Sequence, residues 1–550
     1  MAGQFFIGID VGTGSARAGI FDAAGGLHGV AKHPIAMWRE AGDIVEQSSA
    51  DIWSAVCACV RDVVAASEIS PHAIGGIGFA ATCSLVVVER DGSPLPVGPS
   101  GDPRRNVIVW MDHRASAQAQ AINASAQPVL KYVGGSISPE METPKLLWLL
   151  HNMPATFAAA GHFFDLSDYL TWRATGSLDR SVCTVTCKWT YLAHEKRWDE
   201  AYFRAIGLGI LADEGFGRIG STVVDAATAL GQGLTPDAAQ AFGLPQGTPV
   251  GAALIDAHAG GIGTVGAANA DGQSPPDPRR RLAYIYGTSA CAMATTTGPT
   301  FVPGVWGPYF SAMLPGMWLN EGGQSAAGAA LDHLLRMHPG LPAAAELAKQ
   351  ADMSVLAWLE AQALAQKASL GETARLASRL HIVPEFLGNR APFSDPDALA
   401  IISGVSLDDS VQGLIAFYVA GLCSLAYGAR QIVDALKAQS IPLEQIIVSG
   451  GAALSPLVRQ ILADATGLDV GMAAGSEPVL LGCAILGAVA GGAFPSVMAA
   501  MARMSRLGSV CQPAAGDLKA FHEAKFKIYG ALQDMDRSSR AIMAAVPGQA

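Results

Sequence analysis

The stretch that decides the fold is FIGIDVGTGSARAGIFD, residues 6 to 22. It begins as an apolar strand, reaches the carboxylate Asp10, turns through residues 12–15 and returns as a second apolar strand that contains Arg17. A plain hairpin needs only Asn-Gly or Asp-Gly at its turn. This turn, Gly-Thr-Gly-Ser, instead offers several backbone N–H groups, two hydroxyls and a nearby cation, which are the groups that bind a phosphate chain.

A second stretch repeats this design about half a chain later. LAYIYGTSACAMATTTG, residues 282 to 298, places Gly-Thr-Ser between two apolar strands. The preceding segment, ANADGQSPPDPRRR (268–281), is rich in proline and polar residues and indicates a linker or surface loop. A chance echo of a short turn is the alternative. The strands on both sides favour a duplicated fold, in which two facing domains each supply one phosphate-binding hairpin.

Length and composition set the broad class. At 550 residues the chain is too long for one core, and two large domains are the default. Half of the residues are hydrophobic and 15% are charged, which is typical of a well-buried α/β protein. The formal net charge of -11 argues against nucleic acid as the main partner. The nine scattered cysteines lack zinc-site spacing, so we expect free thiols in a reducing cytoplasm. The N-terminus lacks the pattern of a signal peptide.

One apolar stretch is long enough to span a membrane. Residues 478–502 carry no charge, but Gly491-Gly492 and Pro495 interrupt them and small residues are frequent. We therefore expect a buried helix packed closely against another element, and no membrane span.

The chain before the linker alternates between strands and helices. We expect strands near 4–10, 16–22 and 27–36, then a helix capped by Ser48 or Ser49, then a strand over 73–81. Near the C-terminus, FHEAKFKIYGALQDM (521–535) is typical of an amphipathic helix that docks on its own chain or on a second copy. A homodimer is therefore left open.

The common nucleotide signatures are absent or incomplete. The chain has no G-x-x-x-x-G-K-[ST] loop and no protein-kinase motif set. G-x-G-x-x-G occurs at residues 261–266, but the ribose-binding acid of a dinucleotide site is missing from the next strand. This nearly excludes a Rossmann oxidoreductase, and we interpret these glycines as close packing on a helix. Asp256, at the end of the strand TPVGAALID, is by its position alone a helix cap.

The ordered motifs together resemble the FGGY family of carbohydrate kinases. They run from GIDVGTGSARAGIFD through VIVWMDHRA, SPEMETPKLLWLL, DLSDYLTWRATG, LIDAHAGGIG, YIYGTSACAM and FLGNRAPFSDPDA to SGGAALSPLVRQILADATGLDV, over roughly residues 4 to 492. The resemblance implies an α/β fold of two ribonuclease-H/actin-like domains with the active site in the cleft between them. We expect an N-terminal domain over 1–267 and a C-terminal domain over 282–550, with a helical tail from about 515.

The motifs ATCSLVVVERDG, LIDAHAGGIG and FVPGVWGPYFSAMLPGMWLNEGGQSAAG are closest to the D-ribulokinase branch. This implies phosphorylation of the terminal hydroxyl of a ketopentose by ATP and Mg²⁺, with D-ribulose first and L-ribulose, xylulose or ribitol as alternatives. A non-catalytic actin-fold protein that binds ATP is the more distant alternative.

The resemblance also implies roles for individual residues. Asp256 matches the general base, and Asp10 would orient magnesium. The sugar would contact Ala81, Lys188, Asp256 and Glu321. ATP would contact Thr13, Gly14, Ser15, Arg17, Gly287, Thr288, Ser289, Gly328, Gly450, Gly451, Ala452 and Ser455.

The chain departs from the family pattern at two places. Ribulokinase-like sequences usually carry an acid where this chain has Ala80, which bears on substrate identity. Leu399-Ala400 replaces a common Arg-Gly after DPDA, and we expect this change to affect only a loop.

Overall fold

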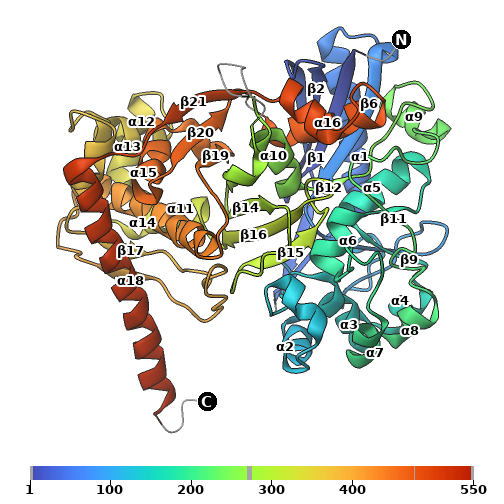
Figure 1. Cartoon of the computed structure of the whole chain (residues 1–550), viewed down its shortest axis with the longest axis horizontal. Helices are drawn as coiled ribbons and strands as arrows, with labels where there is room; N and C mark the ends of the chain where they lie inside the picture. The colour runs from blue at the N-terminus through green and yellow to red at the C-terminus, as the bar shows by residue number, and fades with distance from the viewer. Residues whose placement is uncertain (1–3, 42, 269–275, 476, 547–550) are drawn as a thin grey trace.

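The computed structural model describes residues 4–41, 43–268, 276–475 and 477–546. Residues 269–275 of the expected linker lie outside the described residues. In its described remainder, a short 3₁₀ turn, Pro278–Arg280, leads directly into the first strand of the second half. Figure 1 shows the two halves side by side, the first in blue to green and the second in yellow to red.

A five-stranded sheet forms the core of the N-terminal half. Its strand order is β3-β2-β1-β6-β12, with β1–β3 antiparallel and β1, β6 and β12 parallel. The strands are β1 (Phe5–Val11), β2 (Ser15–Asp22), β3 (Leu27–Pro34), β6 (Ile74–Ala81) and β12 (Leu254–Ile255). The third strand ends two residues earlier than predicted, and a separate strand, β4 (Met37–Glu40), follows it in another sheet.

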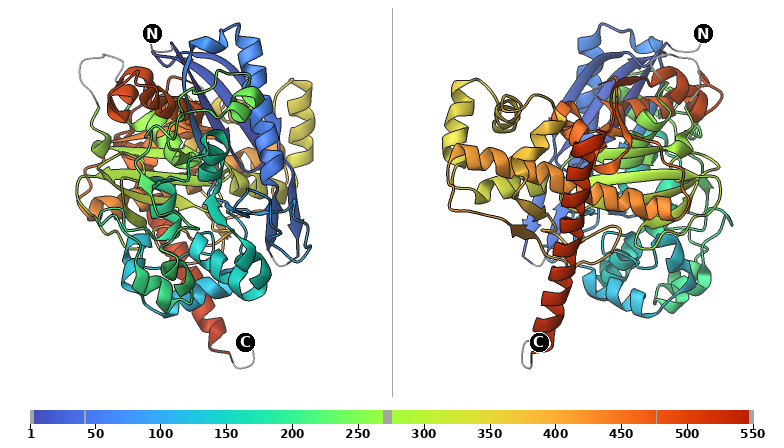
Figure 2. Two further views of the ribbon diagram at one scale, coloured as in Figure 1. Left: turned by 90° about the vertical axis from the view of Figure 1, so that its right-hand side faces the viewer. Right: turned by 60° about the vertical axis from the view of Figure 1, so that its left-hand side comes forward.

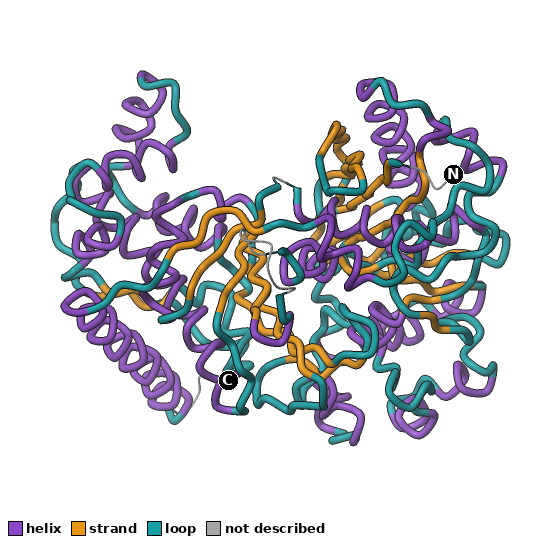
Figure 3. Tube along the Cα trace, turned by 45° about the horizontal axis from the view of Figure 1, so that its top comes forward, coloured by secondary structure: helices purple, strands orange, loops and turns teal. Residues whose placement is uncertain are grey.

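The sheet of the C-terminal half repeats this topology. In the order β16-β14-β13-β19-β20, the first three strands are antiparallel and the last three parallel, with β15 and β21 added at the edges. The strands are β13 (Arg281–Tyr286), β14 (Ala290–Thr296), β15 (Trp306–Phe310), β16 (Trp318–Gln324), β19 (Gln445–Ser449), β20 (Asp469–Ala473) and β21 (Leu507–Cys511). The predicted duplication is therefore confirmed, and Figure 3 shows the two groups of strands with helices around each.

Two helices join the halves. α10 (Asp256–Val265) follows the last strand of the first sheet, and α16 (Pro478–Ala490) follows strand β20 of the second. The two helices pack on each other, and α16 also lies against β1 and β6 of the first sheet. A Cβ added to Gly263 would stand 2.0 Å from the Pro478 carbonyl oxygen, so the glycines of α10 serve close helix packing as predicted. α16 is the buried helix expected in the uncharged stretch.

The remaining elements of the N-terminal half surround this core. Helix α1 (Ser49–Ser67) begins after Ser48, which caps it by accepting the Asp51 N–H. A second five-stranded sheet has the order β4-β5-β8-β7-β9. Its other strands are β5 (Ile44–Gln47), β7 (Leu85–Val88), β8 (Val107–Ile108) and β9 (His162–Asp165). The further helices are α2 (Ser116–Ala124), α3 (Glu142–Asn152), α4 (Pro154–Ala159), α5 (Leu166–Thr175), α6 (Val182–Trp189), α7 (Glu200–Ala205), α8 (Gly209–Asp213) and α9 (Pro236–Phe242). A short pair of strands, β10 (Arg180–Ser181) and β11 (Val223–Val224), precedes and follows α6–α8.

Helices dominate the rest of the C-terminal half. They are α11 (Gly328–Met337), α12 (Leu341–Gln350), α13 (Val355–Leu364), α14 (Val411–Ala438), α15 (Pro456–Thr466), α17 (Val497–Met504) and α18 (Gly516–Ala544). A small strand pair, β17 (His381–Val383) and β18 (Ile401–Ser403), completes this half. α14 is long and apolar enough to cross a membrane, but 78% of its most apolar window is buried inside the fold. The long helix α18 extends at its C-terminal end beyond the rest of the molecule (Figures 1 and 2).

Candidate active site

The first hairpin holds a charged pair, a buried aspartate and a half-buried arginine, one step from its turn. Asp10 on β1 and Arg17 on β2 are register partners, and Arg17 Nη2 donates to Asp10 Oδ2 over 2.5 Å. Arg17 Nη1 also donates to Glu477, directly before α16, over 2.8 Å. Burial raises the pKa of Asp10 although the Arg17 charge opposes the shift. Asp10 Oδ1 is buried without a hydrogen-bond partner among the described residues. The pair is therefore a fixed anion and cation at the end of β1, with one carboxylate oxygen unused.

The turn itself is held in place by side chains on or next to strands β5 and β8 and by the backbone after β3. Trp110 Nε1 donates to Thr13 Oγ1 over 3.1 Å, and Gln47 Nε2 donates to the Thr13 carbonyl over 2.7 Å. The Ile35 N–H donates to the Gly14 carbonyl over 3.2 Å. The loop that contains Ser15 is thus fixed through its carbonyl groups and one hydroxyl.

Asp256 is the first residue of α10 and stands at the same sheet edge as Asp10. β6 separates the two strands, and the register pairs Asp10 with Ala80 and Ile255 with Ala81. With strands about 4.8 Å apart, the two backbones are about 10 Å apart across β6. The Asp256 side chain is half-buried, and its Oδ1 accepts the Ala257 N–H over 2.8 Å.

Burial, followed by the Asp10 charge, raises the pKa of Asp256 to about 6. The charges of His258 and Lys188 oppose that shift, and Asp256 in turn acts on Cys291 at the start of β14. The Asp256 carboxyl is therefore within electrostatic reach of both hairpins and of the charged cluster described next. A carboxyl with a raised pKa at such a point is a candidate proton acceptor.

A buried charged cluster brings together residues from both halves. Lys188 comes from α6 and is 3% exposed, while Glu321 comes from β16 and is 4% exposed. Arg390 Nη2 donates to Glu321 Oε1 over 2.8 Å, and His258 Nε2 lies 3.2 Å from Glu321 Oε2. Each oxygen of the Glu321 carboxylate thus has a nitrogen partner of its own.

Trp306 forms the floor of this cluster. The Lys188 Nζ lies 4.6 Å and the Arg390 guanidinium carbon 4.0 Å from its ring centre. Burial disfavours the charge on Glu321, but the His258 hydrogen bond and the Lys188 and Arg390 charges outweigh it and lower its pKa below the usual range. The cluster therefore presents an ionised carboxylate between cations, an arrangement suited to a ligand with several hydroxyl groups.

A cavity of about 320 Å³ adjoins the cluster. Trp306 and Arg390 of the C-terminal half and His113 and Glu140 of the N-terminal half are among the residues that line it. His113 Nε2 lies 3.7 Å from Glu140 Oε1. The cavity thus has polar walls from both halves of the chain.

A larger cavity of about 980 Å³ lies within the C-terminal half. Six residues that the sequence singles out line it: Gly287, Thr288, Gly328, Gly451, Ala452 and Ser455. They come from the second hairpin, the start of α11 and the segment between β19 and α15. Tyr286, Leu331, Tyr418, Leu422 and Val458 add apolar walls. The size and the mixture of apolar walls with backbone groups suit a large ligand such as a nucleotide.

The second hairpin supports the start of α11 by its backbone. The Thr288 carbonyl accepts the Ala327 and Ala329 N–H groups, and the Gly287 carbonyl accepts the Gly328 N–H over 3.0 Å. A Cβ at Gly328 would stand 2.8 Å from the Gly287 oxygen, so glycine permits this close approach. Ser455 lines the cavity and also caps α15, because its hydroxyl accepts the Val458 N–H over 3.0 Å.

The other predicted site residues lie elsewhere. Gly450 has φ of 92°, and its backbone packs on the Tyr286 backbone next to the large cavity. Ser289 closes the second hairpin, where its carbonyl accepts the Gly287 N–H. Ala81 ends β6 between Val11 and Ile255 and is fully buried. Ala80, at the position of the missing family acid, pairs with Asp10, while Leu399 is 58% exposed in a loop.

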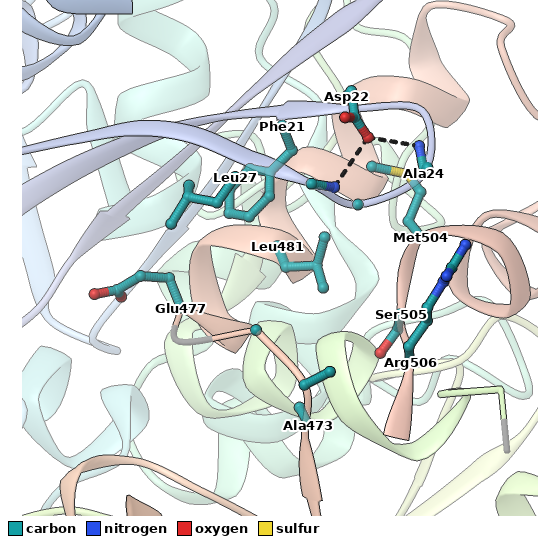
Figure 4. Close-up of a pocket in the computed structure, with 14 residues that line it drawn as sticks. Phe21, Asp22, Ala24, Leu27, Ala473, Glu477, Leu481, Met504, Ser505 and Arg506 are labelled. Carbon is teal, nitrogen blue, oxygen red and sulfur yellow. Dashed lines mark hydrogen bonds between the residues drawn. The ribbon is translucent and has the colours of Figure 1, made fainter. Parts of the chain in front are cut away.

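A separate cavity of about 390 Å³ lies between the β2–β3 turn and the segments around α16 and β21. Figure 4 shows that Glu477 extends away from Arg506. Its carboxylate accepts a hydrogen bond from Arg17. The Asp22 carboxylate accepts hydrogen bonds from the Ala24 and Gly26 N–H groups, and the buried Ser505 hydroxyl donates to the Gly263 carbonyl. These contacts are structural, and the cavity holds none of the predicted site residues.

Three residues of the cluster are missing from the residues predicted from sequence: His258, Arg390 and Trp306. His258 and Arg390 stand in the quoted motifs LIDAHAGGIG and FLGNRAPFSDPDA. A signal was available for His258, because it follows Asp256 by two residues at the start of a helix. Arg390 lies 69 residues from Glu321 in sequence, and only the fold brings the two together. Trp306 stands in the same quoted motif as Glu321 and is its register partner on β15.

Comparisons with known proteins agree with this geometry. The N-terminal domain of the FGGY family of carbohydrate kinases matches residues 5–263, and the C-terminal domain of the same family matches residues 282–491. A human FGGY carbohydrate kinase domain-containing protein is 43% identical over 548 residues, covering 98% of each chain. A D-ribulokinase from Saccharomyces cerevisiae is 37% identical over 513 residues, covering 88% of this chain and 72% of the relative.

Among solved structures, the xylulose kinase from Rhodospirillum rubrum is similar with a TM-score of 0.77, covering 97% of this chain and 99% of that one. At 21% sequence identity, this similarity concerns the fold. It agrees with the predicted pair of actin-like domains.

Proposed function

The chain belongs to the FGGY family of carbohydrate kinases and is a sugar phosphotransferase, and on that premise we propose that its acceptor is a ketopentose. The proposed reaction transfers the γ-phosphoryl group of ATP to the terminal hydroxyl of D-ribulose and yields D-ribulose 5-phosphate and ADP. The name of the yeast relative supports this substrate. The observation that carries the proposal is the position of Asp256, which stands across strand β6 from Asp10 at the same sheet edge and begins the helix whose His258 contacts Glu321.

Asp256 is the proposed general base. Its carboxylate accepts the proton of the sugar hydroxyl as that oxygen attacks the γ-phosphorus and the bond to the β-phosphate oxygen breaks. Positioning and charge stabilisation dominate phosphoryl transfer, so the placement of this carboxylate matters more than its basicity. A pKa of about 6 leaves Asp256 mostly ionised at neutral pH.

The sugar is proposed to bind at the charged cluster. Lys188 would donate to sugar oxygens and Glu321 would accept from sugar hydroxyls, with Ala81 giving backbone contacts at the end of β6. The adjoining cavity of about 320 Å³ provides space beside Trp306 and Arg390. Because an unpaired buried polar group is costly, a site of this kind discriminates among sugars by the position of their hydroxyls.

ATP is proposed to occupy the cavity of about 980 Å³. The segment with Gly451, Ala452 and Ser455 would lie alongside the adenosine, because its small side chains let the backbone approach the base and the ribose closely. Gly287, Thr288 and Ser289 would contact phosphate oxygens from one half, and Thr13, Gly14 and Ser15 from the other. Arg17 is already shared between Asp10 and Glu477, so its contribution to phosphate binding would be a long-range charge.

Asp10 is the residue proposed to hold the magnesium ion. Its buried Oδ1 has no partner among the described residues, and a carboxylate oxygen is the ligand that Mg²⁺ prefers. When bound, the ion neutralises the charge of the phosphate groups. Arg17 keeps the other oxygen of Asp10 fixed, so the carboxylate keeps a single orientation.

The test is a comparison of acceptors with the purified full chain. ADP release is measured with ATP and magnesium and with D-ribulose, L-ribulose, D-xylulose or ribitol, and the phosphorylated carbon is located by ³¹P and ¹³C NMR. We expect the highest kcat/KM with D-ribulose and a product phosphorylated at its terminal hydroxyl.

Assays without sugar, and with Asp256→Asn, control for ATP hydrolysis and for contaminating kinases. Faster turnover with another acceptor would replace D-ribulose in the proposal. ADP release that does not depend on any of the four acceptors would overturn the pentulokinase assignment.

A further inference from the structure

A buried chain of polar groups continues from Glu321 to α6. Cys183 Sγ lies 2.9 Å from His258 Nδ1, and His258 Nε2 lies 3.2 Å from Glu321 Oε2. Cys183 and His258 are fully buried. The chain thus runs from sulfur through imidazole to carboxylate and ends at the Arg390 guanidinium.

The Cys183 sulfur is surrounded by donors. The Ile255 N–H points to it over 3.4 Å, and Cys187, one helical turn further along α6, lies in the same cluster with His258. A sulfur that accepts from several donors at once favours the thiolate over the thiol. Burial opposes ionisation of Cys183, but the Cys187 hydrogen bond and the His258 charge lower its pKa. Burial likewise opposes the charge on His258, and the Cys183 and Glu321 interactions raise its pKa.

The resulting charges alternate along the chain. A thiolate at Cys183, an imidazolium at His258, a carboxylate at Glu321 and a guanidinium at Arg390 sum to zero. Each buried charge then has an opposite neighbour in direct contact, which limits the cost of burying it. An imidazolium also donates from both nitrogens, so it fixes its ring between the sulfur and Glu321 Oε2.

The same sulfur also reaches the segment that carries the proposed base. Ile255, whose N–H it accepts, directly precedes Asp256. One side chain therefore contacts the strand end before Asp256 and, through His258, orients the carboxylate of Glu321.

We propose that Cys183 is a positioning residue, which aligns Asp256 and Glu321 with each other through the Ile255 N–H and the His258 ring. This proposal rests on the proposed function, in which Glu321 binds the sugar and Asp256 accepts the proton of the sugar hydroxyl. It adds a reason for a buried cysteine in an active site where sulfur takes no part in the reaction.

The protonation of His258 is the direct test, and it needs no substrate. The wild-type full chain is labelled with ¹⁵N-histidine, and the His258 signal is identified with His258→Gln. We expect both nitrogens of His258 to be protonated at neutral pH, and one of them to lose its proton in Cys183→Ser. Wild-type His258 with an unprotonated Nδ1 would overturn the proposal, as would one equivalent of bound zinc in the purified protein, since a metal at Cys183, Cys187 and His258 would replace that proton.

Kinetics supply the second test. We expect Cys183→Ser to raise the KM for the sugar and lower kcat, by roughly ten- to a hundredfold in kcat/KM, while the KM for ATP stays within twofold. Cys423→Ser is the matched control, because Cys423 is a buried cysteine on α14 within the C-terminal core. Melting temperatures of both variants identify any general loss of stability.

Unchanged sugar kinetics in a folded Cys183→Ser protein would contradict the positioning role. If the wild type turns over none of the sugars, the pentulose assignment fails. In that case the protonation of His258, measured by NMR, still tests whether Cys183 and His258 form the proposed thiolate–imidazolium pair.

Discussion

The hairpins β1–β2 and β13–β14 share one topology and a Gly-Thr pair in the turn, but they differ in the pair of residues one step before the turn. In the first hairpin this pair is Asp10 and Arg17, and in the second it is Ile285 and Cys291. The first carries fixed charges and contacts α16 through Glu477. The second uses backbone carbonyls to support α11 beside the large cavity. The two copies of the fold thus differ in role: the first hairpin carries charged side chains, and the second forms part of a ligand pocket.

The strongest test removes the carboxylate that stands between these two hairpins. We expect Asp256→Asn to lower kcat by roughly 10²- to 10⁴-fold, because the sugar hydroxyl loses its proton acceptor. ATP binding, measured by calorimetry, should be unchanged, since the nucleotide cavity lies in the other half. Turnover within threefold of the wild type would remove Asp256 from the proposed mechanism.

The next test breaks the charged pair of the first hairpin. We expect Asp10→Asn to lower kcat about a hundredfold and to raise the magnesium concentration needed for half-maximal rate, because the fixed negative charge is lost. The counterpart change Ile285→Val in the second hairpin removes one methylene group, and kcat should stay within twofold. Equal losses in the two variants would mean that the hairpins do not differ in the way described.

A third change addresses the pocket of the second half. A Cβ added to Gly451 meets no atom within 4 Å, so Gly451→Val is compatible with the backbone while it occupies space at the large cavity. We expect the KM for ATP to rise about tenfold with the sugar KM within twofold. Gly298→Val, an exposed position that is equally open and lies outside the cavity, is the matched control. A selective rise in the sugar KM would assign the cavity to the other substrate.

The smallest effect concerns pH. Burial and the Asp10 charge raise the pKa of Asp256 to about 6, and only its ionised form can accept a proton. The kcat/KM for the sugar should therefore fall about twofold from pH 7 to pH 6, and about tenfold by pH 5. Stopped-time assays in buffers of constant ionic strength measure this profile. A rate that stays flat down to pH 5 would show that the Asp256 carboxyl titrates like an exposed aspartate.

Local patterns were sufficient to predict the two hairpins but not the cluster. The apolar runs around Asp10 and residues 287–289 identify the two hairpins, because turn residues and strand periodicity are local signals. Lys188 carries no such signal, and by itself a lysine in TVTCKWTYL is more often exposed. It is buried because Glu321 and Trp306, which come from the other half, supply charge and ring contacts.

The family resemblance supplied Lys188 and Glu321, but it left the sulfur–imidazole contact undetected. Cys183 and His258 are separated by 75 residues, and both lie in segments whose helical pattern reveals only that they are buried. The third strand was also predicted to extend to residue 36. It ends at Pro34 because the chain enters the sheet β4-β5-β8-β7-β9 at Met37. The alternation of apolar and polar residues does not reveal such a change of neighbouring strand.

The position of α16 has a consequence for how the protein is made. A Cβ at Gly8 or Gly78 would stand within about 2 Å of the α16 carbonyl oxygens of Leu480 or Cys483, so the two surfaces meet backbone to backbone. During translation, β1 and β6 leave the ribosome some four hundred residues before this helix. The nascent N-terminal sheet must therefore wait with an uncovered apolar face until α16 has been synthesised, and we expect chaperones to bind it in that interval.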